Sequence, residues 1–148
     1  LVYNRNLELL KTLYNPNYGW GITHDNKSLI VSDGSYYLYF RDPSSFNEQR
    51  RIIVHDHNDT IYNLNELEWV DGVIYANVFG LNYIAMIRPE DGEVIAWLDL
   101  SLLYKSLSLT DKNAVLNGIA SIPNSKHILV TGKMWPKMFE ITLIPVVK

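Results

Sequence analysis

Two groups of polar residues have types and spacing that chemistry can use. Glu66 and Glu68 stand two positions apart in a strand-like segment, so both side chains face one way. They could mimic a carboxylate pair, although residues spaced in this way are more often structural hydrogen-bond acceptors or solvated. His55-Asp56-His57 offers metal-ligand side chains, but two histidines and one aspartate beside a loop are a weak metal signature. Neither group defines an activity by itself.

Other classes of function are excluded by what the sequence lacks. Gly132-Lys133 is not a phosphate loop, because the upstream glycine is missing and Met134 replaces the hydroxyl residue. A formal net charge of −3 gives no basic footprint for nucleic acid. No apolar run approaches the ~20 residues that a membrane span needs. The absence of cysteine removes disulfides, thiolate zinc sites and cysteine nucleophiles together. We therefore expect neither a nucleic-acid partner nor a membrane span.

The elements that must position these residues are predicted to be β-strands. Apolar residues alternate with a period of two, β-branched and aromatic residues are enriched, and short turns separate the runs. One helix-like stretch, residues 100–109, is short and serine-rich. This pattern predicts an all-β fold. The expected strands are Leu29–Val31, Tyr36–Phe40, Arg51–Val54, Val73–Val78, Tyr83–Ile87, Val94–Trp97, Ile128–Val130 and Met138–Ile144.

The chain also repeats itself with a period near fifty residues. Trp20 and Asn65 are 45 residues apart, and Asn65 and Asn117 are 52 apart. Periods of ~40–50 residues with about four strands each are typical of β-propeller blades. A solenoid is the alternative, but its repeats are usually shorter or helical. The three similar segments are Gly19-Trp20-Gly21-Ile22-Thr23, Leu64-Asn65-Glu66-Leu67-Glu68 and Leu116-Asn117-Gly118-Ile119-Ala120, each followed by a turn and a β-rich strand.

The repeat predicts three blades, starting near residues 18, 64 and 115. Residues 1–17 fit the end of a preceding blade, and the third repeat has no room for a fourth strand. Propellers avoid exposed sheet edges by closing into a ring, and an open arc would leave those edges free. We therefore expect that this chain does not fold alone. It would need the missing blades, as a second chain or as the other half of a chain cut at an exposed loop.

The order of the motifs resembles that of the plant and bacterial glutaminyl cyclases, also called glutamine cyclotransferases. Each motif alone is weak, but the series spans nearly the whole chain in the family's order. The matching segments are Gly19-Trp20-Gly21-Ile22-Thr23, Leu29-Ile30-Val31-Ser32-Asp33-Gly34-Ser35, Asp42-Pro43, Leu64-Asn65-Glu66-Leu67-Glu68-Trp69-Val70-Asp71-Gly72, Tyr75-Ala76-Asn77-Val78, Leu116-Asn117-Gly118-Ile119-Ala120 and Val130-Thr131-Gly132-Lys133-Met134-Trp135-Pro136-Lys137.

This resemblance implies a five-bladed β-propeller, of which residues 1–148 would be the C-terminal portion of a single domain. It implies an enzyme that converts the N-terminal glutamine of a peptide or protein to pyroglutamate and releases ammonia, without a metal or other cofactor. The remaining partner would be the N-terminal part of the propeller. Secretion is a further expectation, since Asn26-Lys27-Ser28 and Asn58-Asp59-Thr60 form glycosylation sequons in segments expected to be loops.

The resemblance also carries site residues, position by position. Trp20 matches the tryptophan of the family's Gly-Trp-Gly motif and would be a wall of the substrate pocket. Asn65 opens the Asn-Glu-Leu-Glu motif and would hydrogen-bond the substrate amide or amine. Lys133 matches the family's pocket lysine and would polarise the amide oxygen. Phe79, fourteen residues after Asn65, stands where the family usually has tryptophan, which keeps an aromatic wall but loses an indole N–H donor.

The family's proposed catalytic glutamate has no counterpart in this sequence. It lies in a Gly-Glu-Gly-Leu-Thr motif on the blade before Trp20, and that motif is absent here. Glu66 and Glu68 belong to a different motif and are not substitutes. The chain therefore holds part of an active site and is expected to be inactive alone. The alternative is a propeller that has lost its chemistry and serves as a binding platform for peptides or proteins, which Phe79 slightly favours.

Overall fold

The computed structural model describes residues 1–144 and contains one short helix and otherwise only strands and turns within that range. The predicted all-β fold is confirmed. Residues 145–148 of the predicted domain lie outside the described residues. The elements are β1 Val2–Tyr3, β2 Leu9–Lys11, β3 Gly21–His24, β4 Leu29–Ser32, β5 Tyr37–Arg41, β6 Glu48–Ile53, β7 His55–Asp56, β8 Asp59–Thr60, β9 Leu64–Val70, β10 Val73–Val78, β11 Tyr83–Ile87, β12 Val94–Asp99, α1 Ser101–Ser106, β13 Leu116–Ser121, β14 His127–Gly132 and β15 Phe139–Thr142.

Three antiparallel sheets make up the body of the molecule. The first sheet has the order β3-β4-β5-β6, the middle sheet β9-β10-β11-β12, and the third sheet β13-β14-β15. In each sheet the strands follow the chain order, so neighbours are joined by short turns. The small hairpin β1-β2 stands apart from the sheets, and a second small hairpin, β7-β8, contacts β12. The three sheets begin at residues 21, 64 and 116, close to the spacing of the sequence repeat, and the described part of the third sheet has three strands.

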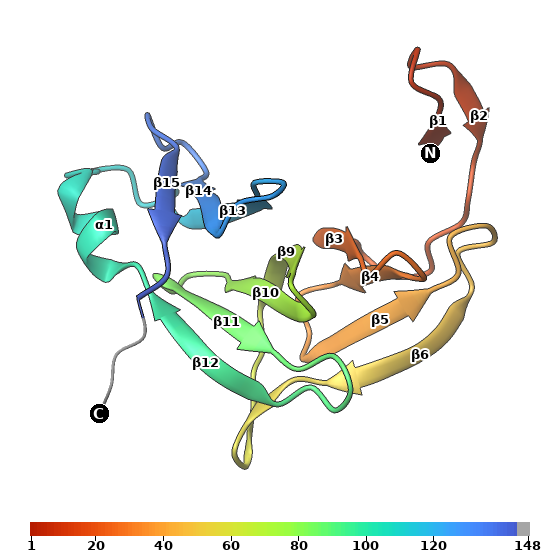
Figure 1. Cartoon of the computed structure of the whole chain (residues 1–148), viewed down its shortest axis with the longest axis horizontal. Helices are drawn as coiled ribbons and strands as arrows, with labels where there is room; N and C mark the ends of the chain where they lie inside the picture. The colour runs from red at the N-terminus through yellow and green to blue at the C-terminus, as the bar shows by residue number, and fades with distance from the viewer. Residues whose placement is uncertain (145–148) are drawn as a thin grey trace.

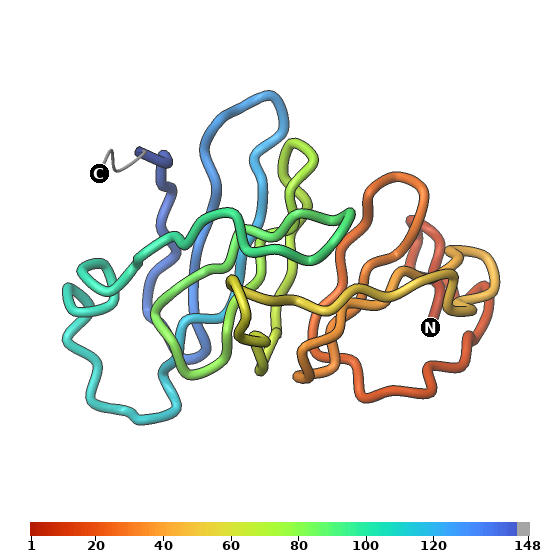
Figure 2. The backbone as a smooth tube through the Cα atoms, turned by 90° about the horizontal axis from the view of Figure 1, so that it is seen from below, coloured from red at the N-terminus to blue at the C-terminus, as the bar shows by residue number. Residues whose placement is uncertain are grey.

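The first strands of the three sheets lie together. Strand β9 packs against β3 on one side and against β13 on the other, and the later strands spread away from this line (Figures 1 and 2). Since β4, β10 and β14 pair antiparallel with these first strands, the start of each first strand and the end of each second strand lie at the same end of a sheet.

Two apolar clusters fill the spaces between the sheets. The middle sheet contributes to both, because alternate residues of a strand point to opposite faces. Ile74, Ala76 and Val78 of β10 belong to the cluster shared with the first sheet, while Tyr75 belongs to the cluster shared with the third sheet. This burial on both faces explains why Val73–Val78 is almost continuously apolar rather than alternating.

The helix is shorter than the ten-residue stretch predicted from the sequence. Helix α1 covers Ser101–Ser106. Ser108 has a φ of 50°, in the left-handed region, and this conformation stops the helix before Leu109. Within residues 1–144 no helix has the length and hydrophobicity to cross a membrane.

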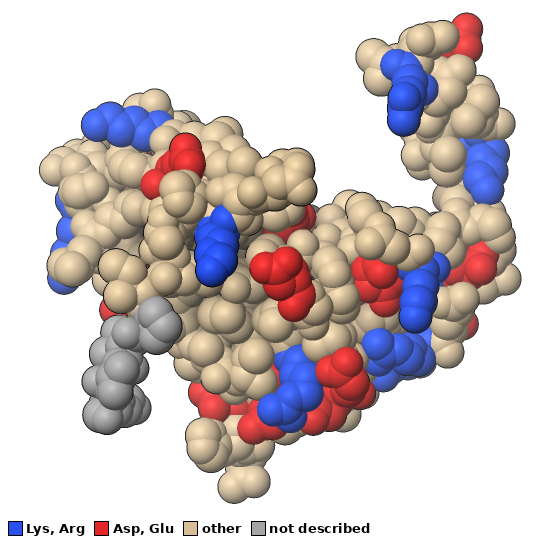
Figure 3. All heavy atoms as spheres, viewed as in Figure 1, with Lys and Arg blue, Asp and Glu red and all other residues tan. Residues whose placement is uncertain are grey.

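Charged side chains of both signs are interspersed over the lower part of the face in Figure 3, without a large area of one sign there. Several form exposed ion pairs. Arg88 Nη1 lies 2.8 Å from Asp91 and 2.5 Å from Glu93, and Arg51 Nε lies 2.8 Å from Glu48. Exposed pairs of this kind contribute little to stability, so packing between the sheets carries the fold.

Candidate functional site

Three of the four residues predicted for the site lie in a row. The ring centroids of Trp20 and Phe79 are 6.0 Å apart with an interplanar angle of 71°, an edge-to-face arrangement. Lys133 Nζ lies over the face of the Phe79 ring, 5.1 Å from its centroid, in a cation–π arrangement. Trp20 is 42% exposed and Phe79 is 39% exposed, so both rings keep surface for a ligand.

These three residues come from three different sheets, and the topology brings them together. Trp20 directly precedes β3, Phe79 directly follows β10, and Lys133 directly follows β14. All three positions therefore lie at the same end of their sheets. Backbone bonds fix the positions that follow the second strands: Phe79 N donates to Asn63 O at 2.8 Å, and Lys133 N donates to Val115 O at 2.9 Å.

Trp20 is held by the turn between β4 and β5. Its backbone N–H donates to Ser32 O at 2.9 Å, and its indole packs directly over Gly34. A Cβ on Gly34 would lie 2.7 Å from the Trp20 ring, and the φ of 84° at Gly34 also favours glycine. The glycine at position 34 thus sets where the tryptophan wall stands.

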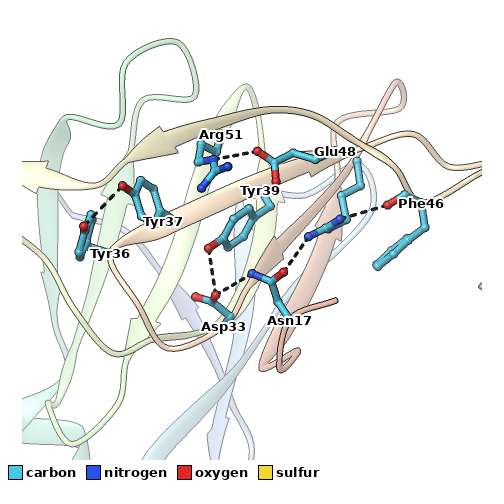
Figure 4. Close-up of polar contacts among 9 residues, drawn as sticks. Asn17, Asp33, Tyr36, Tyr37, Tyr39, Phe46, Glu48 and Arg51 are labelled. Atoms are coloured by element: carbon cyan, nitrogen blue, oxygen red, sulfur yellow. Dashed lines mark hydrogen bonds and ion pairs between the residues drawn. The ribbon is translucent and has the colours of Figure 1, made fainter. Parts of the chain in front are cut away.

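A polar network stiffens the same turn (Figure 4). Asp33 Oδ2 accepts hydrogen bonds from Tyr39 Oη at 3.0 Å and from Asn17 Nδ2 at 3.1 Å, and Asp33 Oδ1 accepts from the Ser35 backbone N–H at 3.0 Å. Burial by itself raises the pKa of Asp33, but the hydrogen bonds from Ser35, Asn17 and Tyr39 outweigh it and lower the pKa below the usual value. The ionised carboxylate is therefore the form that holds the turn beneath Trp20.

Asn65, the fourth predicted residue, lies beside this row and is buried. Its backbone carbonyl accepts a hydrogen bond from Ser32 Oγ at 2.6 Å, and Ser32 Oγ in turn accepts from Gly21 N at 2.9 Å. These two bonds tie β9 to β3 next to Trp20. They use the backbone of Asn65 and not its side-chain amide. Asn65 is 5% exposed.

Asn77 joins the middle sheet to the third sheet in a similar way, a role that reasoning from the motifs did not find. Asn77 Oδ1 accepts a hydrogen bond from Gly118 N at 2.8 Å, while Asn77 Nδ2 is buried without a partner among the described residues. Ser32 and Asn77 have similar places in their sheets. Ser32 ends β4, the second strand of the first sheet, and Asn77 lies one residue before the end of β10, the second strand of the middle sheet. The side chain of each bonds to the first strand of the next sheet. The repeat could have pointed to this shared role, although a serine and an asparagine do not resemble each other.

The two glutamates of β9 have different surroundings. Glu68 Oε1 accepts hydrogen bonds from Ser121 N at 2.8 Å and Ser121 Oγ at 2.6 Å, so Glu68 is the structural acceptor that the sequence suggested. Glu66 lines a cavity of about 250 Å³ that Trp20 also lines. Burial, and secondarily the charge of Glu68, raises the pKa of Glu66 above its usual value.

His55-Asp56-His57 does not form a metal cluster. Asp56 Oδ2 accepts from the Trp97 indole N–H at 2.8 Å, and Asp56 Oδ1 lies 2.7 Å from His57 Nδ1. Within residues 1–144 no three His, Cys, Asp or Glu side chains are grouped in a way that could hold a metal ion. The triplet instead attaches the β7-β8 hairpin to β12.

A larger cavity is lined by Phe79 and Lys133. Its volume is about 620 Å³, and its lining also includes Asn82, Tyr104 and Lys112. Two hollows thus border these residues: Trp20 and Glu66 line the smaller one, and Phe79 and Lys133 line the larger one.

Comparisons with known proteins show the family of the chain. The family model described as glutamine cyclotransferase matches residues 1–143. The chain belongs to the glutamine cyclotransferase family. A glutaminyl-peptide cyclotransferase of Arabidopsis thaliana is 37% identical over 142 residues, which is 94% of this chain and 44% of the relative. The crystal structure of Myxococcus xanthus glutaminyl cyclase matches with a TM-score of 0.85 and 37% identity, over 88% of this chain and 57% of that chain.

The chain therefore spans less than half of this cyclotransferase relative and somewhat more than half of the solved cyclase. The family resemblance drawn from the sequence is confirmed. The roles of Trp20, Asn65, Phe79 and Lys133 stay predictions, as do the number of blades and the division of the chain into blades. What the geometry adds is that residues chosen from three separate motifs meet at one end of the three sheets.

Proposed function

We propose that this chain forms part of the substrate pocket of a glutaminyl-peptide cyclotransferase. The substrate is a peptide or protein with an N-terminal glutamine. The observation that carries the proposal is the row of Trp20, Phe79 and Lys133 beside Asn65, in a chain of the glutamine cyclotransferase family.

In the reaction, the α-amino nitrogen attacks the side-chain carboxamide carbon of the same residue. A new C–N bond closes the pyroglutamate ring, the carboxamide C–N bond breaks, and the α-amine's proton leaves with ammonia. The nucleophile is tethered to the carbon that it attacks, so orientation supplies much of the rate. The α-amine has a reference pKa of about 7.7–8.0, which leaves a usable neutral fraction near neutral pH.

Each residue of the site has a role in this chemistry. Trp20 and Phe79 hold the aliphatic stem of the glutamine and exclude water. The Lys133 ammonium stabilises the negative charge that develops on the carboxamide oxygen. The Asn65 amide hydrogen-bonds the amide or the amine and fixes their orientation. The carboxylate that carries the proton lies in a part of the protein outside this sequence, and no metal takes part.

The three sheets are, in this proposal, three blades of a five-bladed propeller. The support is the contact of β9 with both β3 and β13, which brings the first strands together as the inner strands of blades. The partner that completes the ring is the N-terminal remainder of the propeller, and this chain alone is inactive. The protein is secreted, an assignment supported by the exposed turn positions of Asn26 and Asn58, which leave both sequons accessible.

The test is turnover of a Gln-initiated peptide by the full-length protein, followed by ammonia release and by the mass of the product. We expect chelator-resistant turnover. We expect Lys133→Met to lower kcat by roughly 100-fold, as for the loss of one donor to an oxyanion. Lys126→Met is the matched control, since Lys126 is exposed in the turn between β13 and β14, at the opposite end of the third sheet.

The result decides between catalysis and binding alone. If the protein binds Gln-initiated peptides but releases no ammonia from any of them, it is the peptide-binding platform that Phe79 favours and not an enzyme. Equal kcat for Lys133→Met and Lys126→Met would remove Lys133 from the chemistry.

A further inference from the structure

We propose that the cavity beside Phe79 and Lys133 binds the residues that follow the N-terminal glutamine, and that it favours an acidic side chain there. The proposal rests on the proposed function, since it assigns the specificity of the same site. It concerns the cavity of about 620 Å³, which is within the ~300–1,000 Å³ typical of ligand pockets.

The position of the cavity follows from the path of a bound peptide. The α-amine and the side chain of the glutamine are both consumed in ring closure, so the rest of the peptide leaves the pocket through the α-carbonyl. Phe79 and Lys133 belong both to the row of site residues and to the lining of the cavity. A peptide held against Phe79 therefore has the cavity directly beside it.

The chemistry of the lining selects for negative charge. Lys112 and Lys133 contribute two ammonium groups, Asn82 and Asn113 contribute amide donors, and Tyr104 contributes a hydroxyl. Among the described residues that line the cavity there is no aspartate or glutamate. This set matches the carboxylate oxygens of an aspartate or glutamate side chain.

The acidic residue nearest to Lys112 in the sequence does not line the cavity. Asp111 precedes Lys112, and its Oδ1 accepts a hydrogen bond from the Asn113 backbone N–H at 2.8 Å, within its own turn. The chain as a whole has a formal net charge of −3. At long range this negative charge repels acidic peptides. A preference for acidic peptides would therefore have to come from the local lysines.

The experiment measures kcat/KM of the full-length protein for Gln-initiated peptides that carry Asp, Ala or Lys at the second or at the third position. We expect the order Asp, Ala, Lys at one of the two positions, with steps of roughly two- to five-fold, because an exposed charge pair contributes modestly. The steps should shrink at high salt, which screens exposed charges.

Lys112 is the residue to change, because the proposal gives it no part in ring closure. Lys112→Gln should abolish about half of the Asp-over-Lys preference in kcat/KM. Lys112→Glu should reverse the preference. Lys126→Gln is the control and should keep it.

Two results would overturn the proposal. One is equal kcat/KM for the three peptides at both positions. The other is an Asp-over-Lys preference that is as large in Lys112→Gln as in Lys126→Gln. If no peptide is cyclised, the proposed function fails, and the cavity is then tested separately. Direct titration with the pyroglutamyl forms of the same peptides should give the same order of Kd, and equal Kd values would reject the acidic preference.

Discussion

Gly21 provides the sharpest test of how the site is held, because it lies where β3 touches β9. A Cβ at this position would lie 2.1 Å from the Asn65 carbonyl oxygen and 2.9 Å from Glu66 Cα. Ordinary van der Waals contact begins at 3.4 Å, so Gly21→Ala must separate the two strands by about 1 Å. Both obstructing atoms belong to the backbone, so no side-chain rotation can relieve the clash.

The cost of Gly21→Ala has two parts. Overpacking of a tight contact costs about 1–3 kcal/mol. The separation also stretches the bond from Ser32 Oγ to Asn65 O, 2.6 Å long and buried, and leaving a buried acceptor without its partner costs about 1–3 kcal/mol. We therefore expect the free energy of unfolding to fall by about 2–6 kcal/mol.

Urea unfolding of the full-length protein, followed by circular dichroism, measures this loss. Gly72→Ala is the control, because Gly72 has a φ of 87° but a Cβ added there would meet nothing within 4 Å. Only the strain of a left-handed backbone, about 1–2 kcal/mol, is therefore added. Gly21→Ala and Ser32→Ala should be less than additive, since they act on the same contact. The reasoning is refuted if Gly21→Ala is no more destabilising than Gly72→Ala.

Three other side chains, Asn77, Asp33 and Glu66, should each affect stability measurably. Asn77→Ala removes the acceptor of Gly118 N and should lower the free energy of unfolding by about 1–3 kcal/mol; a loss no larger than that of an exposed Asn→Ala variant in the same urea titration would contradict it. Asp33 has a lowered pKa, so its ionised form stabilises the fold above the unfolded-state pKa of about 3.9, and this contribution is lost as pH falls through the lower folded pKa. Asp33→Asn should therefore weaken the acid dependence of stability below about pH 4, and unchanged acid unfolding curves would count against the network with Tyr39. Glu66 has a raised pKa, so its ionisation opposes folding as pH rises through that pKa. Glu66→Gln should therefore be more stable than the wild type at neutral pH and lose this advantage in acid. A Glu66→Gln variant that is less stable than the wild type at neutral pH would contradict the raised pKa.

The strands could be predicted from the sequence because their signal is local. Val73–Val78 and Tyr83–Ile87 pair as the expected hairpin, with Ile74 opposite Ile87. The repeat likewise located β3, β9 and β13, since Trp20, Asn65 and Asn117 recur at blade-like intervals. The end of helix α1 was missed because the left-handed conformation of Ser108 has no signature in a run of serine and leucine.

The sequence could predict which residues belong to the site, but not how they lie relative to one another. Motifs named Trp20, Asn65, Phe79 and Lys133, but their proximity depends on how sheets pack, which no local pattern encodes. The bonds between sheets are the clearest example. Asn77 reaches Gly118 across 41 residues of sequence, a contact that exists only once both strands are in place.

The cavity lined by Lys112 was missed for the same reason. Its lining combines residues from the turn after β10, from α1 and from the segment before β13. Lys112 itself lies in an exposed loop, where a lysine is ordinarily a solvated side chain. Only the neighbourhood of Phe79 and Lys133 makes it a candidate for specificity.

In the proposed enzyme, residues of three sheets form one pocket for an N-terminal glutamine. The most direct measurement is a crystal structure of the full-length protein with the pyroglutamyl-peptide product bound. We expect the lactam ring to lie against Trp20 and Phe79, with its oxygen facing Lys133 and Asn65 within hydrogen-bond distance. A product bound elsewhere, with Trp20 and Lys133 both without contact to it, would contradict the account.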